Sequence, residues 1–238
     1  MATASYAISP ARKKPELQGA WNGPAWGEAQ ILEIGHFRPE GSDHRPRTQA
    51  KLLYGHDAIY GLFRVADRFV RCVHRRHQDP VYKDSCVEFF IQPSAGEGYF
   101  NFEFNCGGTL LASYVTDPLR TDRGLAGFKR LTKSDVREIA VYHSQPRIID
   151  PENTEPVTWY LEFGIPYRLL EHYAGAVEIG PDALWRGNLF KCAAETSHPH
   201  WASWSPVDDL NFHLPRCFGT FTFASHVTCR SAGPAHDD

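Results

Sequence analysis

The chain has 238 residues, of which 42% are hydrophobic and 13% aromatic, and its formal net charge is -3 at pH 7. This length and composition allow a full hydrophobic core, and an all-β chain of this size commonly forms one domain. The acidic balance excludes a typical nucleic-acid partner, because affinity for nucleic acid comes largely from clustered Lys and Arg. No run approaches the roughly eighteen apolar residues of a membrane span. Residues 1–14 lack an apolar stretch that could act as a secretory signal.

The first strands are predicted as a hairpin over residues 50–65. Residues 50–54 and 58–65 are rich in apolar side chains, and the short segment 55–57 between them favours a turn. In the second strand, Ile59 and Phe63 would face the core.

Two further strands are predicted over residues 84–93 and 99–106, where apolar and polar residues alternate with period two. A loop containing Gly96 and Gly98 joins them. The second strand would present one face to the core (Phe100, Phe102, Phe104 and Cys106) and the other to solvent (Tyr99, Asn101, Glu103 and Asn105). A sheet face that mixes carboxylates, amides and aromatic rings suits sugar binding, although any solvated sheet can show it.

The rest of the chain continues this pattern. Strands are predicted over 136–143, 157–165, 188–194 and 219–223, and a short helix over 167–174. Many short strands with Pro- and Gly-rich connections predict an all-β fold, specifically an antiparallel β-sandwich of the jelly-roll kind with short helical turns. We expect one domain spanning residues 1–238, with a core of about 17–225 and flexible ends.

The segment 197–206 is a candidate recognition loop. Trp201 and Trp204 lie three residues apart in a Pro-bounded, His-rich stretch, and strand alternation cannot explain both. A tryptophan face can stack on the C–H face of a pyranose ring. For Trp204 a second interpretation stays open, in which it plugs the end of the sandwich. His198 belongs to the same loop and suits hydrogen bonding to a ligand.

Glu88 and Glu103 are the one pair of carboxylates that suggests catalysis. They fall on the polar phase of strands that we expect to be neighbours. A retaining glycosidase places its two carboxyls about 5 Å apart, which opposite residues on paired strands can match. Two glutamates on a sheet are more often solvated.

Metal ligands and cysteines give weaker signals. Cys72, His74 and His77 are close in sequence but lack the matching second pair of a zinc site. A structural calcium ion held by loop Asp residues and backbone oxygens remains open. The six cysteines are dispersed, and we expect mostly free, buried thiols.

Taken in serial order, several motifs resemble a known family. They lie at residues 84–90, 99–105, 108–111, 159–166, 185–188, 204–206 and 212–219. Their order resembles carbohydrate-binding module family 9, a branch of the DOMON-like β-sandwiches, over most of the chain from about residue 54 to 223. The resemblance implies a non-catalytic module that binds β-glucans, xylan-type chains or their reducing-end sugars. It also implies association with secreted glycoside hydrolases, an extracellular or periplasmic location, and calcium as a structural ion in some members.

The resemblance assigns a role to individual positions. Tyr82, just before the first motif, would be one stacking ring, and Trp201 or Trp204 the second. The polar partners of the sugar would be Glu88, Glu103 and Asn105, with Arg186 as a further donor to its hydroxyls, since an arginine fork can meet two hydroxyls at once. The haem-binding branch of the superfamily is disfavoured, because Met1 is the only methionine that could serve as an axial ligand.

The leading hypothesis is therefore non-catalytic binding of an oligosaccharide or polysaccharide. One alternative is a glycan-active hydrolase that uses Glu88 and Glu103. The other is a structural or interaction domain without a small ligand, which predicts that both late tryptophans, Trp201 and Trp204, are buried.

Overall fold

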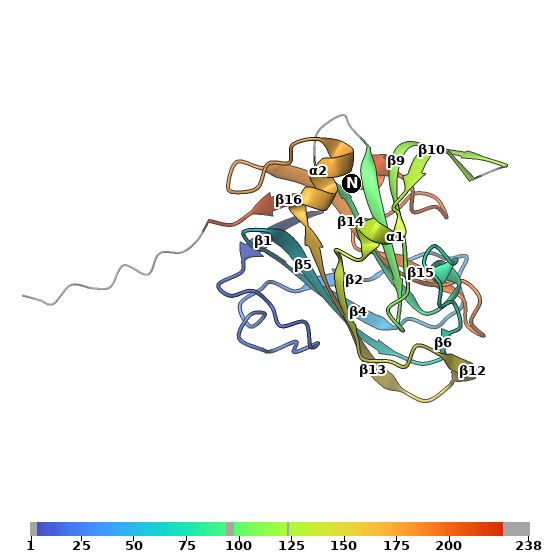
Figure 1. The fold of residues 1–238 in the computed structure, drawn as a ribbon. Coiled ribbons are helices and arrows are strands. Elements are labelled where there is room, and N and C mark those ends of the chain that lie inside the picture. The colour runs from blue at the N-terminus through green and yellow to red at the C-terminus, as the bar shows by residue number, and fades with distance from the viewer. Residues whose placement is uncertain (1–3, 94–97, 123, 226–238) are drawn as a thin grey trace, which may run out of the picture.

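A computed structural model of the chain describes residues 4–93, 98–122 and 124–225, and most of its regular elements are strands (Figure 1). The elements, in chain order, are β1 (Ser5–Pro10), β2 (Leu32–Ile34), β3 (His36–Phe37), β4 (Arg47–Tyr54), β5 (Ala58–Asp67), β6 (Val70–Cys72), the 3-10 turn η1 (Val81–Lys83), β7 (Cys86–Gln92), β8 (Tyr99–Asn105), β9 (Leu110–Thr121), β10 (Gly124–Arg130), α1 (Lys133–Val136), β11 (Ala140–His143), β12 (Ile149–Asn153), β13 (Val157–Pro166), α2 (Tyr167–Ala174), β14 (Leu184–Ala193), β15 (His200–Ser203), the 3-10 turn η2 (Pro215–Cys217) and β16 (Gly219–Phe223).

Apart from β6 and β12, which pair with each other, the described strands form two packed sheets that share β1. The first sheet runs in the order β10-β9-β8-β7-β14-β16-β1, and the second runs β1-β4-β5-β13-β11. Residues 5–8 pair in parallel with β16, and residues 9–10 pair in parallel with β4. The other pairings among the described strands are antiparallel. The predicted all-β sandwich is confirmed, with one parallel strand at its seam.

The main core lies between the two sheets. Phe163 on β13 stacks against Phe89 on β7 and Phe104 on β8, with ring centroids 5.4 and 5.3 Å apart. All three side chains are fully buried, and burying each one stabilises the fold by roughly 1.5–3 kcal/mol. The apolar phase predicted for β8, which includes Phe104, therefore faces the core.

The predicted central strands match the structure in register. β4 and β5 form the hairpin expected at residues 50–65, and β7 and β8 pair with Glu88 opposite Glu103. Helix α2 has the predicted bounds. Gly96, in the predicted loop between β7 and β8, lies outside the described residues.

One predicted strand begins too early. Residues 133–136 form α1, whose capping box joins Thr132 and Asp135, and β11 starts only at Ala140. The Thr-x-x-Asp pattern satisfies the free backbone N–H groups of a first helical turn, so it overrides the apparent alternation.

The expectation of an irregular N-terminal end is wrong for residues 5–10. They form β1, in which Tyr6 and Ile8 are buried. A strand with so few apolar residues gives a weak alternation signal, and its partners β16 and β4 are distant in sequence. Residues 226–238, the other predicted flexible end, lie outside the described residues.

The polar face of β8 is also buried, contrary to the prediction that it is solvated. Asn101, Glu103 and Asn105 are at most 5% exposed. A second apolar cluster covers this outer face, and its members come from η1, β7, β8, β9, β14 and residues 207–218. The β9–β10 hairpin projects at the same side of the molecule (Figure 1). The first sheet is thus buried on both faces around the site described next.

Candidate functional site

A cavity of about 360 Å³ lies on the outer face of the first sheet, above β7, β8 and β9. Its floor is polar and its walls are largely aromatic. The floor includes Glu88, Asn101, Glu103, Ser113 and Cys192, and the walls include Tyr82, Arg120, Phe128, Arg130, Trp201, Asn211 and His213. Its size falls within the range of small-molecule sites in proteins.

Two aromatic rings, Tyr82 and Trp201, are held on either side of β14. The backbone carbonyl of Tyr82 accepts a hydrogen bond from the amide of Ala194 at 3.1 Å. Trp201 pairs with Cys192 on the opposite edge of β14. Tyr82 is 41% exposed and Trp201 is half-buried, so both rings are open to a ligand.

The floor presents hydrogen-bonding atoms that the described protein residues do not satisfy. Asn101 donates from Nδ2 to Oε1 of Glu103 at 2.7 Å. Asn101 Oδ1 and Glu103 Oε2 are buried and have no partner. Buried polar atoms are nearly always hydrogen-bonded, so two such acceptors facing one cavity indicate a place for a ligand with hydroxyl donors.

Burial controls the charge of the floor. Burial raises the pKa of Glu88 well above its usual range, and the neighbouring Cys192 and Glu103 raise it further. Burial also raises the pKa of Glu103 to about 7, against the opposing effect of the hydrogen bond from Asn101. The pKa of His213, again through burial, is lowered to about 3, so that this ring is neutral. A protonated carboxyl can donate as well as accept, which suits sugar hydroxyls.

Four of the eight predicted ligand-binding residues meet in this cavity: Tyr82, Glu88, Glu103 and Trp201. The other four lie elsewhere. Asn105, although in the same phase of β8 as Glu103, binds the backbone of His74 and the carboxylate of Asp84, and it stabilises the loop before η1.

Arg186 does not line the cavity and affects it only by holding a neighbouring segment in place. Its guanidinium donates to the carbonyls of Pro215 and Phe218 at 2.9 and 3.4 Å. These bonds hold η2, which follows the residues 210–213 that line one wall. Arg186 is therefore a positioning residue in this structure, because its Nη2 donates to the backbone of this segment and the side chain does not line the cavity.

His198 and Trp204 also lie outside the cavity. The His198 ring stacks on Phe69 with centroids 3.7 Å apart. Trp204 is 9% exposed, stacks on Phe221 at 5.1 Å and belongs to the main core, so it is a packed residue. The structure thereby distinguishes the two late tryptophans.

Sequence reasoning missed Asn101 as a site residue, and it missed the arginines of the β9–β10 hairpin, Arg120 and Arg130. Asn101 shares the alternation of Glu103, so that pattern could have found it. The hairpin carries Pro118 and irregular pairing, with register shifts between Leu125 and Phe128, which weaken its strand signal.

Within the described residues, one group has the spacing of a metal site: Cys86, Glu88 and Cys192, whose ligand atoms lie within 4.8 Å of one another. Two thiols and one carboxyl do not fit calcium, which takes six to eight oxygen ligands. A structural zinc site takes four protein ligands, and this group offers three. Cys192 Sγ instead donates to Glu88 Oε1 at 3.2 Å. The five described cysteines are free, and Cys229 lies outside the described residues.

The sandwich and its cavity define a β-sheet binding module whose site combines open aromatic rings with a buried polar floor. The sequence model of carbohydrate-binding family 9 matches residues 27–223, so the chain belongs to this family. Members are non-catalytic carbohydrate-binding modules, and the chain is accordingly a binding module and not an enzyme. The alternative of a hydrolase acting through Glu88 and Glu103 is thus not supported.

Solved structures show the same fold. A crystal structure of a protein from Bacteroides uniformis matches with a TM-score of 0.78 and 23% identity, over 93% of this chain and 98% of the other. A family 9 module from Caldicellulosiruptor kristjanssonii in complex with glucose matches with a TM-score of 0.57 and 11% identity, over 96% and 98% of the two chains. Its complex with cellotriose matches with a TM-score of 0.60 and 11% identity, over 98% and 100%.

A comparison with curated proteins finds no match. In the described part of the chain, no helix has the length and apolar character needed to cross a membrane.

Proposed function

We propose that the chain binds β-glucan or xylan-type oligosaccharides, or their reducing-end sugars, in the cavity between Tyr82 and Trp201. The rings would stack on the apolar faces of a sugar, and the floor would bind its hydroxyls. The observation that carries the proposal is the pairing of two open aromatic rings with two unpartnered buried acceptors, Asn101 Oδ1 and Glu103 Oε2.

The chemistry of a pyranose supports this assignment. Its ring has C–H groups that pack on aromatic faces, and its edge has hydroxyls that can donate to carboxylate and amide oxygens. Each aromatic ring can bury roughly 150–250 Å² of surface, enough to dominate the affinity of a small site. The module from Caldicellulosiruptor kristjanssonii, which shares this fold, is known with glucose and with cellotriose.

The third hypothesis, a structural domain without a small ligand, predicts that Trp201 and Trp204 are both buried. Trp204 is, but Trp201 is only half-buried and lines the cavity. Association with a glycoside hydrolase stays a prediction.

Calorimetric titration with cellotriose and xylotriose tests the proposal. The wild-type chain should bind at least one of them. Tyr82→Ala and Trp201→Ala should each weaken binding by about tenfold or more, since each removes a stacking surface. Ile148→Ala, which truncates an apolar side chain that is 49% exposed and outside the cavity, should leave the affinity unchanged. Flat titrations across a broad panel of β-linked glycans would refute the proposal.

A further inference from the structure

Two arginines of the β9–β10 hairpin, Arg120 and Arg130, line the same cavity as the aromatic rings. Arg120 pairs with Leu125 near the tip of the hairpin, and Arg130 pairs with Ser113 near its base. Both arginines are exposed. The hairpin thus places positive charge at both ends of one cavity wall.

These guanidinium groups have no carboxylate partner among the described residues. Arg120 makes one long contact, from Nη2 to Asn211 Oδ1 at 3.5 Å. Arg216, near the same wall, is by contrast paired with Asp208 at 2.7 Å. Arg120 and Arg130 can therefore turn to a ligand without breaking an ion pair.

The acidic residues of the floor do not cancel this charge. The titratable groups that line the cavity are Tyr82, Glu88, Glu103, Arg120, Arg130, Cys192 and His213. Glu88 and Glu103 are buried, and that burial raises both pKa values. The positive charge of Arg120 opposes the effect of burial and lowers the pKa values of both glutamates. Arg120 therefore interacts electrostatically with the floor of the cavity. The cavity is cationic in a chain whose net charge is -3.

We propose that the sugar in this cavity carries an anionic group, a carboxylate or a sulfate, which pairs with Arg120 or Arg130. The inference rests on the proposed function, because it places a pyranose between Tyr82 and Trp201. A planar guanidinium binds a carboxylate or sulfate through two parallel hydrogen bonds. An uncharged sugar would leave both arginines to water, whereas a uronic acid unit or a sulfated sugar would use them.

Calorimetry with four monosaccharide probes tests the inference: glucose, glucuronate, the methyl ester of glucuronate and glucose 6-sulfate. The ester keeps the shape of the uronate and removes its charge. We expect glucuronate or the sulfate to bind about fivefold more tightly than its uncharged counterpart, the upper range for an exposed ion pair, and to lose this preference at high salt. The tighter of the two charged probes identifies the anionic group.

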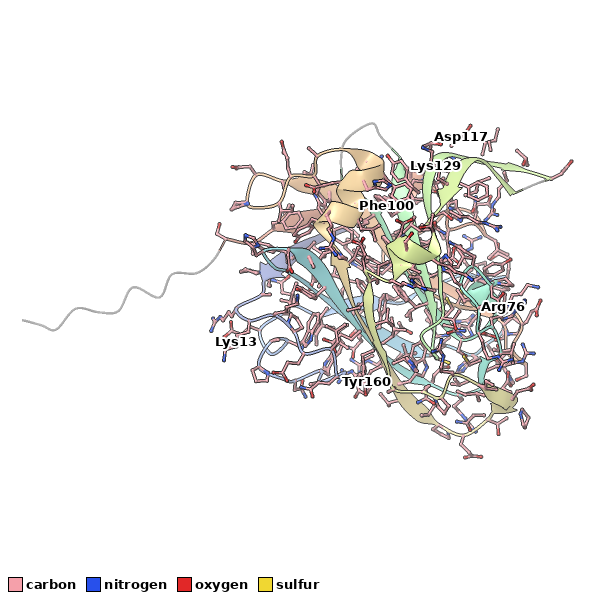
Figure 2. The ribbon with its side chains drawn as sticks, in the orientation of Figure 1. Lys13, Arg76, Phe100, Asp117, Lys129 and Tyr160 are labelled. Atoms are coloured by element: carbon pink, nitrogen blue, oxygen red, sulfur yellow. The ribbon has the colours of Figure 1, made fainter. Side chains whose placement is uncertain are left out.

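Variants locate the contact. Arg120→Gln or Arg130→Gln should reduce the ratio of charged-probe to glucose affinity toward one. Lys129→Gln is the matched control, because Lys129 lies on the β9–β10 hairpin (Figure 2). It precedes Arg130 in the sequence and does not line the cavity. This variant should keep the ratio.

Two results would overturn the inference: equal affinity for charged and uncharged probes, or a preference that survives both arginine substitutions. If glucose binds and the charged probes bind no better, the proposed function stands and only this inference fails. If glucose, cellotriose and the charged probes all fail to bind, both fall together.

Discussion

Glu88 and Glu103 lie opposite each other on paired strands beneath the aromatic rings, and both are almost fully buried. Burial disfavours their charged forms, so each glutamate holds its proton to a higher pH than an exposed glutamate does. The same burial makes the stability of the protein depend on pH.

The pKa of Glu103 is about 7 in the folded protein, above its ordinary value of 4.5. The folded state therefore holds a proton that the unfolded state releases between these values. This contribution to stability is fully present below about pH 4.5 and is lost as the pH rises through about 7, on the order of 3 kcal/mol in total.

Urea unfolding at about pH 5 and pH 8 measures this effect. The free energy of unfolding should fall over that interval, and it should fall less in Glu103→Gln, which cannot ionise. The same pH dependence in both proteins would contradict the assigned pKa of Glu103.

Substitution of Trp201 and of Trp204 should affect stability and sugar binding differently. Trp204→Ala should lower the free energy of unfolding by about 3–5 kcal/mol, because it leaves a cavity against Phe221. Trp201→Ala should cost markedly less stability while weakening sugar binding, because its ring is only half-buried. Urea unfolding and calorimetry on both variants separate the two roles, and equal losses of stability would contradict them.

At the scale of elements, the pairing of β5 with β13 depends on close packing between Gly61 and the ring of Phe163. Gly61 lies opposite Phe163, and a Cβ at Gly61 would come within 2.2 Å of the Phe163 ring. The ring covers the glycine and also stacks on Phe89 and Phe104, so it cannot move away without disturbing the core.

Gly61→Ala should accordingly destabilise the fold by about 1–3 kcal/mol through overpacking. Gly35→Ala is the matched control, because a Cβ there meets nothing within 4 Å, and it should be neutral or slightly stabilising. Thermal unfolding of both variants gives the comparison, in which a stable Gly61→Ala protein would show that the Phe163 ring can shift.

In the strands around the cavity, the sequence pattern predicts which side chains face the core, but not which of the others line the cavity. Alternation correctly predicted which side chains of β8 face the core, because a strand has a period of two, although the opposite face is buried as well. It could not separate Asn101, which lines the cavity, from Asn105, which holds a loop, since both occupy the same phase of β8. That distinction depends on which segments cover each end of the strand.

At the scale of the whole molecule, β1 joins the two sheets. Ile8 on this strand is fully buried, and β1 pairs with both β16 and β4. Ile8→Ala should lower the free energy of unfolding by about 2–5 kcal/mol in a single cooperative transition, because both sheets lose a shared contact. Ile31→Ala, at a side chain that is 49% exposed, should change it by less than about 0.5 kcal/mol.

Near-ultraviolet and far-ultraviolet circular dichroism during unfolding provide the check. Two separate transitions in wild type, one for each sheet, would contradict the role of β1 as their joint.

The sequence by itself determined the all-β class, the hairpins of neighbouring strands and the inward faces, because these depend on alternation and local turns. It also determined the family, through motifs in serial order, and four residues of the cavity: Tyr82, Glu88, Glu103 and Trp201. Only the tertiary structure decided that β1 closes the sandwich, that Trp204 is packed inside and that Arg120 and Arg130 reach the cavity. Each of these outcomes depends on contacts between segments distant in the chain, which no local pattern encodes.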